Sequence, residues 1–200
     1  VIHEIKKYAE RPYLKDRKIE SVHFGGGNPF LVPLNDLRRI VETIKSCFQI
    51  DVNDNWTMEG SINSITCEEY PKGLLDLGIN RISFGIQTFK EDIRKSMNIK
   101  STVTDIYHGI DILNKAGLNE YCIDMMYNLP NQSVEDFIDD LKKVTELEPY
   151  HIDIYNMAVF PNTYLDKLVH TKGYFNITPS NENQMKMFKE GDRWLLENGY

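Results

Sequence analysis

The sequence predicts an α/β fold in which parallel strands alternate with helices. Five short apolar or alternating segments are each followed by a segment whose apolar residues have helical spacing. Because separate helices connect consecutive strands, we expect parallel strands with right-handed crossovers. Such a chain forms either a doubly wound sheet or part of a βα barrel. In both folds the ligand binds at the carboxyl ends of the strands.

The predicted strands end in small or polar residues. The strands cover residues 19–24, 56–59, 81–86, 122–126 and 151–159. The residues at their carboxyl ends are 25–28, 59–61, 85–87, 124–128 and 158–161. We therefore expect these five short segments to lie on one face and to form the binding surface.

Helices are expected between and around these strands. They cover residues 1–11, 34–44, 66–77, 90–97, 102–115, 133–147, 164–170 and 180–198. Thr66 with Glu69, and Ser133 with Asp136, have the spacing of a capping box, in which the first side chain caps the helix N-terminus. Gly78 ends one of the helices.

The composition is that of an ordinary soluble globular chain. Its 200 residues suit one domain over 1–200, with 41% hydrophobic and 26% charged residues. A net charge of −7 argues against nucleic-acid binding. No apolar run reaches the roughly 20 residues of a membrane span, and the charged N-terminus is no signal peptide. We expect a cytoplasmic protein and, because the first residue is not Met, a segment upstream of Val1.

The three cysteines lie far apart. Cys47, Cys67 and Cys122 have neither a disulfide pattern nor Cys-x-x-Cys spacing, so we expect no metal site from this chain. Cys47, on the apolar side of a helix, and Cys122, within a strand, are interpreted as small core residues. His23 precedes the glycine run, and we expect it to pack in the strand rather than to act in catalysis.

The first strand ends in the segment Phe24-Gly25-Gly26-Gly27-Asn28-Pro29. Glycines accept positive φ angles and leave the backbone open to a ligand, and Pro29 prevents the strand from continuing. A tight turn without a ligand is the alternative interpretation.

Four segments together resemble a known family. The glycine segment resembles the Gly-Gly-Gly-Thr-Pro motif of radical S-adenosylmethionine (SAM) enzymes of the oxygen-independent coproporphyrinogen III oxidase type. Gly85-Ile86-Gln87-Thr88-Phe89 resembles the family's Gly-Val-Gln-Ser-Phe. Residues 123–132 resemble Asp-Leu-Ile-Tyr-Gly-Leu-Pro-x-Gln, and Pro161-Asn162-Thr163 resembles Pro-Gly-Thr. The segments occur in family order between about residues 19 and 163.

The resemblance implies a partial (β/α)₆ TIM-like barrel that binds SAM at the carboxyl ends of its strands. The five strands would correspond to the second to sixth strands of that core, which would lack its first strand and the cluster loop. The implied SAM-binding residues are Gly26, Gly27, Asn28, Glu59, Gln87, Asp124 and Ala158.

Each of these residues would have a role in SAM binding, and for each the alternative is a purely structural role. The backbone of residues 26–28 would contact the methionine end, and Glu59 would accept from its ammonium unless it is merely exposed. Gln87 suits ribose or carboxylate, or else satisfies loop backbone. Asp124 would contact the ribose, or else cap a neighbouring helix. Ala158 would lie near adenine, or else belong to the core.

The chain also departs from the family pattern. Ile99 stands where the family has an Arg that pairs with the methionine carboxylate, and Arg94 or Lys100 could substitute. Asn128 replaces a Gly and tolerates a left-handed turn. The family's [4Fe–4S] cluster needs Cys-x-x-x-Cys-x-x-Cys, which is absent, so we expect a fragment that is inactive by itself.

The resemblance implies a radical SAM oxidoreductase or methyltransferase whose full-length form holds the cluster, acts on a tetrapyrrole or haem, and takes electrons from a donor such as flavodoxin. A haem-binding chaperone of the same superfamily and a cluster-free barrel enzyme that binds phosphate are the alternatives. Glu59-Gly60-Ser61-Ile62-Asn63 resembles the Glu-Gly-Arg-x-Asn of the anaerobic haem-degrading branch. We expect Ile62, which replaces a Pro of the other branches, to loosen this loop.

Overall fold

The computed structural model describes residues 1–14, 17–163, 166–167 and 181–200. The predicted helix over 164–170 lies almost entirely outside the described residues. The chain divides into two compact units. Unit 1 comprises Val1–Phe84 and Tyr107–Tyr121, and unit 2 comprises Gly85–Ile106 and Cys122–Tyr200.

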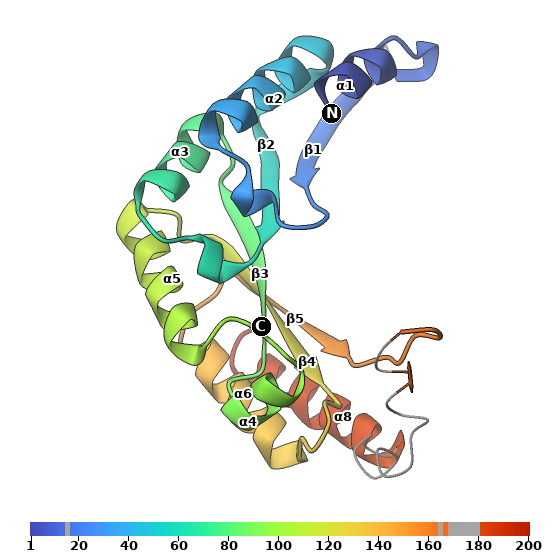
Figure 1. Cartoon of the computed structure of the whole chain (residues 1–200), viewed down its shortest axis with the longest axis vertical. Helices are drawn as coiled ribbons and strands as arrows, with labels where there is room; N and C mark the ends of the chain where they lie inside the picture. Colours follow the sequence, from blue (N-terminus) through green and yellow to red (C-terminus); the bar gives the residue numbers. More distant parts are fainter. Residues whose placement is uncertain (15–16, 164–165, 168–180) are drawn as a thin grey trace. The chain divides into compact units, whose positions relative to one another are not determined.

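The described strands form a five-stranded sheet in the order β1-β2-β3-β4-β5 (Figure 1). They are β1 (Lys18–Phe24), β2 (Gln49–Gly60), β3 (Arg81–Gln87), β4 (Tyr121–Tyr127) and β5 (His151–Asn156). The pairs β1/β2, β2/β3 and β4/β5 are parallel, as the sequence predicts. Strand β2 begins earlier than predicted, and β5 ends three residues before the predicted end.

In unit 1, helices pack on one face of the strands. These helices are α1 (Ile2–Ala9), α2 (Leu34–Cys47) and α3 (Glu69–Leu77). Trp56 and Met58 of β2 are buried on the helix-facing side, and the Phe24 and Trp56 rings lie 6.1 Å apart. Thr57 and Glu59, which alternate with them, are only half-buried. One face of the strands therefore belongs to the core, and the other carries polar side chains.

The two ends of α3 differ in how well the sequence predicts them. Gly78 ends the helix at a φ of 90°, as expected. The predicted Thr66 cap is wrong, because α3 begins at Glu69 with Glu68 at the N-cap position and no side-chain capping bond. A capping box needs its Ser or Thr at the N-cap itself, and Thr66 lies two residues too early.

Unit 2 contains the end of β3, most of β4 and all of β5. Its helices are α4 (Glu91–Ser96), α6 (Val134–Thr145) and α8 (Asn181–Glu197). The capping box of Ser133 and Asp136 is present, as predicted. Phe137 of α6 is fully buried and touches α8 where Gly191 leaves room, since a Cβ there would overlap the Phe137 ring. Helix α5 (Val103–Ala116) runs from one unit into the other.

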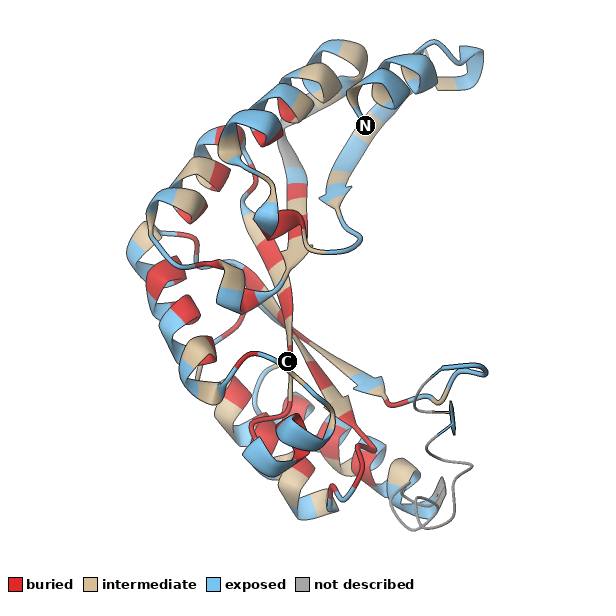
Figure 2. Cartoon of the chain, viewed as in Figure 1, coloured by how far each residue is buried: buried red, intermediate tan, exposed pale blue. Residues whose placement is uncertain are grey.

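Burial alternates along β3 and β4 (Figure 2). Ile82, Phe84 and Ile86 are buried, whereas Ser83 and Gln87 are half-buried. This period of two puts the polar residues of each strand on the face opposite to the helices. Within the described part of the chain, no helix is both long and apolar enough to cross a bilayer.

Candidate functional site

The glycine segment after β1 is a turn whose backbone is open. Gly26 and Gly27 have φ angles of 81° and 65°, in the left-handed region. A Cβ on either residue would meet nothing within 4 Å. The positive φ angles therefore favour glycine at these positions, and no side chain covers this exposed turn.

Glu59 connects this turn to the end of β2. Its Oε1 accepts a 2.6 Å hydrogen bond from the Gly26 backbone N–H. Its Oε2 lies 3.6 Å from His23 Nε2, and the side chain is 44% exposed. The carboxylate thus holds the turn and still presents an accessible oxygen that can accept from a cationic ligand.

Asn28 joins the same turn to the loop after β2. Its Oδ1 accepts from the Ser61 N–H at 3.1 Å, and its Nδ2 donates to Ser64 Oγ at 2.8 Å. A Cβ on Gly60 would overlap the Phe30 ring, so the two loops also pack closely. The Asn28 side chain therefore bonds within the protein, and its carbonyl oxygen accepts from the Leu31 N–H at 3.0 Å, so of its backbone groups the N–H remains for a ligand.

That Ile62 makes this loop looser than a Pro would stays a prediction. Ile62 begins a short 3₁₀ turn, Ile62–Ser64, and is 1% exposed. A Cβ on Gly109 would overlap the Ile62 side chain, so the two residues are in close contact. Ile62 anchors the loop to the core because its large apolar side chain is buried there.

The expectation that His23 packs in the strand is wrong. Its side chain is 54% exposed, and its Nδ1 lies 2.8 Å from Thr57 Oγ1. His23 alternates with Val22 and Phe24, which face the helices, and so it lies on the polar face beside Glu59.

In unit 2, Gln87 is the last residue of β3, as predicted, and has a φ of 69°. A Cβ on Gly85 would overlap the Gln87 Nε2. The Gln87 side chain is therefore folded back over Gly85, where the absence of a side chain makes room for the amide.

The other two predicted residues of unit 2 differ from expectation in part. Asp124 is half-buried and lies in the middle of β4, level with Asp153 of β5, rather than at the end of its strand. Ala158 follows β5 and is exposed, so its interpretation as a core residue is wrong. Asn128, after β4, has a φ of 66°, as its replacement of Gly predicts.

The structure brings together some of the predicted residues. Within unit 1, the Gly26–Asn28 turn and Glu59 are in direct contact. Gln87, Asp124 and Ala158 belong to unit 2. That both sets surround one SAM stays a prediction.

Arg94 does not substitute for the family arginine. It is 1% exposed, and its guanidinium donates to the backbone oxygens of Ile86, Thr88 and Ser101. Lys100 is exposed and donates to Asn98 Oδ1 at 2.7 Å. The buried network around Arg94 was not predicted, because its residues lie in a segment that reads as a charged surface helix.

The cysteines do not fit an iron–sulfur cluster. Cys47 and Cys122 are half-buried rather than core residues, and Cys67 is exposed. Among the described residues, no three His, Cys, Asp or Glu side chains are grouped so that they could hold a metal ion. The open glycine turn and Glu59, in contrast, fit the methionine end of SAM, which needs backbone groups and an acceptor for its ammonium.

The chain belongs to the radical SAM superfamily, whose family model matches residues 1–144. It is 31% identical over 193 residues to the heme chaperone HemW of Haemophilus influenzae. That alignment covers 94% of this chain and 47% of HemW. It is 28% identical over 200 residues to anaerobilin synthase of Escherichia coli O157:H7. That alignment covers 100% of this chain and 44% of the enzyme.

The fold is similar to that of coproporphyrinogen III oxidase HemN from Escherichia coli, described as a radical SAM enzyme. The TM-score is 0.85 at 25% identity, over 100% of this chain and 44% of HemN. This match confirms the predicted fold class, the α/β partial barrel of the radical SAM core. The chain spans about half the length of the relatives it matches.

Proposed function

We propose that this chain is the SAM-binding core of a radical SAM enzyme that acts on a tetrapyrrole. The observation that carries the proposal is the contact between the open glycine turn and Glu59. It presents accessible backbone groups next to a half-exposed carboxylate, at the carboxyl ends of β1 and β2.

Each residue would recognise one part of SAM. Glu59 would accept from the methionine ammonium, and the backbone of Gly26, Gly27 and Asn28 would contact the methionine end. Gln87 and Asp124 would hydrogen-bond the ribose or the carboxylate, and Ala158 would lie beside the adenine. These residues bind and orient the cofactor, and the barrel walls would exclude water.

The cluster of this superfamily would need ligands other than the cysteines of this chain. When bound, such a cluster supplies the electron that cleaves SAM. The described residues contribute cofactor binding rather than cluster ligation. In the cell we place the protein in the cytoplasm, with an electron donor such as flavodoxin.

For the substrate we favour haem. Anaerobilin synthase matches the whole of this chain, and residues 59–63 resemble the haem-degrading branch. Haem transfer without SAM cleavage is the second candidate, because the heme chaperone HemW is 31% identical. Because the chain belongs to the radical SAM superfamily, we do not propose the alternative of a cluster-free barrel enzyme that binds phosphate.

The test uses the complete gene product that carries this chain, loaded anaerobically with iron and sulfide. Haem and coproporphyrinogen III are supplied in separate reactions with SAM and a reductant. We expect haem to be consumed together with SAM. Loss of propionate carboxyls from coproporphyrinogen III, with haem unchanged, would support the oxidase activity instead. Tight haem binding without SAM cleavage would support the chaperone.

A further inference from the structure

Gln87 has an unusual backbone conformation for a residue with a side chain. Its φ of 69° is in the left-handed region, which non-glycine residues rarely adopt outside turns. A residue persists in that conformation only where its surroundings fix it. The structure shows two buried charged residues that contact the backbone on either side of Gln87.

Arg94 of α4 contacts both neighbours of Gln87. Its Nη1 donates to the backbone oxygens of Ile86 and Thr88, each at 2.6 Å. Its Nε and Nη2 donate to the Ser101 backbone oxygen, and Nη2 also donates to Ser101 Oγ at 2.7 Å. The five N–H groups of a guanidinium are thus all used, four of them on backbone oxygens.

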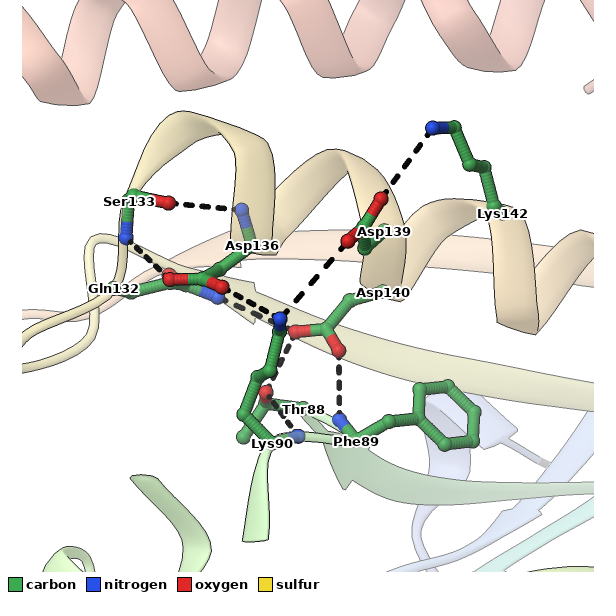
Figure 3. A network of polar contacts seen from close by, with 9 residues as sticks. All are labelled: Thr88, Phe89, Lys90, Gln132, Ser133, Asp136, Asp139, Asp140 and Lys142. Atoms are coloured by element: carbon green, nitrogen blue, oxygen red, sulfur yellow. Dashed lines mark hydrogen bonds and ion pairs between the residues drawn. The ribbon is translucent and has the colours of Figure 1, made fainter. Parts of the chain in front are cut away.

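Asp140 of α6 holds the next two residues of the loop (Figure 3). It is 0% exposed, and it accepts from Thr88 Oγ1 at 2.6 Å and from the Phe89 N–H at 2.8 Å. Thr88 Oγ1 in turn accepts from the Lys90 N–H at 3.1 Å. Lys90 Nζ pairs with Asp136 at 2.6 Å, which connects the loop to the start of α6.

The two buried charged side chains, Arg94 and Asp140, do not hydrogen-bond to each other. Because the N–H groups of Arg94 go to Ile86, Thr88 and Ser101, none remains for Asp140. A buried charge costs free energy unless it is hydrogen-bonded. Part of that hydrogen bonding goes to the segment 86–89: Arg94 donates to Ile86 and Thr88 besides Ser101, and Asp140 accepts from Thr88 and Phe89 besides Gln132. Arg94 therefore holds the backbone on both sides of Gln87 by hydrogen bonds, and Asp140 does the same for Thr88 and Phe89, the two residues that follow.

We propose that Arg94 and Asp140 are positioning residues that fix Gln87 for cofactor binding. They hold its backbone in the left-handed conformation, which folds its amide over Gly85 on the polar face of β3. The inference rests on the proposed function, because it takes Gln87 as a SAM ligand. Neither Arg94 nor Asp140 touches the cofactor in this account.

The test is a double-mutant cycle on the complete gene product, with the dissociation constant of SAM as the readout. Arg94→Lys keeps the positive charge but lacks the planar guanidinium group, so it cannot donate to the backbone oxygens of both Ile86 and Thr88. We expect Arg94→Lys and Gln87→Ala each to weaken SAM binding about tenfold. In the Gln87→Ala background, Arg94→Lys should then change the affinity by less than about twofold.

Val144→Ala is the matched control. Val144 is fully buried in the same unit, on α6, and has no hydrogen bond to the loop. It should lower the stability of the unit without changing SAM affinity in the folded protein. If Arg94→Lys and Gln87→Ala instead have independent, multiplying effects on affinity, the positioning role is overturned.

Hydrogen exchange of the 86–89 segment gives a readout that does not depend on SAM. Arg94→Lys should speed exchange in this segment selectively, whereas Val144→Ala should not. Unchanged exchange at 86–89 would overturn the inference. If Gln87→Ala leaves SAM affinity unchanged while exchange responds as expected, the assignment of Gln87 as a ligand fails, and with it the link from Arg94 to cofactor affinity.

Discussion

The backbone N–H of Gly26 donates a 2.6 Å hydrogen bond to Oε1 of Glu59. This bond joins the glycine turn after β1 to the end of β2, two segments 33 residues apart in the chain. It makes the turn and the carboxylate one structural element, so that a change in either should affect the other.

Gly26→Ala should therefore weaken SAM binding as well as stability. The left-handed conformation should cost about 1 kcal/mol of unfolding free energy for any residue with a Cβ. Gly117→Ala is the matched control, because Gly117 has a similar φ of 84° and equally open surroundings, at the end of α5. Urea unfolding should show similar losses for both variants, and SAM titration a loss for Gly26→Ala alone. Equal SAM affinity in the two variants would contradict the role of the turn.

Ser133→Ala should destabilise the protein by about 1 kcal/mol, because Ser133 and Asp136 form a complete capping box on α6. Thr66→Ala should have little effect, since Thr66 does not cap α3. Chemical denaturation of the two variants measures the difference. A loss for Thr66→Ala as large as that for Ser133→Ala would show that the capping assignment is wrong.

Asp140 should make stability fall as pH rises through its titration range. Burial raises the pKa of Asp140 above its ordinary value, against the hydrogen bonds from Thr88 and Phe89. The folded state therefore binds this proton more tightly than the unfolded state, where the pKa is about 3.9. The contribution of Asp140 to stability is greatest below that value and is lost as pH rises through the raised pKa.

Asp140→Asn removes this titration. The unfolding free energy of the wild type minus that of the variant should decline as the pH rises from below about 3.9, the ordinary pKa, through the raised pKa of Asp140 in the folded protein. Urea unfolding at several pH values measures the difference. A difference that grows with pH would mean that the carboxylate is stabilised, rather than destabilised, by its site.

The 200-residue chain by itself should not hold an iron–sulfur cluster, because its three cysteines are not grouped. Anaerobic reconstitution followed by visible absorbance and iron analysis tests this expectation. Stoichiometric iron and sulfide in the reconstituted chain would require cluster ligands that the cysteine positions do not provide.

The strands and their polar ends could be predicted from the sequence because both follow from local patterns. A period of two separates the buried Ile82, Phe84 and Ile86 from Gln87, and Gly25 ends β1. The same period also indicates that His23 lies on the polar face, but the general tendency of strand residues to pack outweighed it in our prediction.

The network around Gln87 could not be predicted from local patterns, since its members come from β3, α4 and α6. Arg94 lies among charged residues typical of a solvated helix, and only its long-range contacts bury it. Asp140 did leave a signal. It falls on the apolar stripe of α6 with Phe137, Leu141 and Val144, where an acidic residue needs a buried partner.

The most direct test of SAM binding is calorimetric titration of SAM into the complete gene product with Glu59→Gln. Gln keeps the shape but removes the charge that would attract the methionine ammonium. Glu42→Gln, an exposed position on α2, is the control for a lost negative charge. We expect SAM to bind the wild type and Glu42→Gln alike, and Glu59→Gln at least about tenfold more weakly. Equal affinities in all three proteins, or no binding of SAM to the wild type, would contradict the assignment of this site.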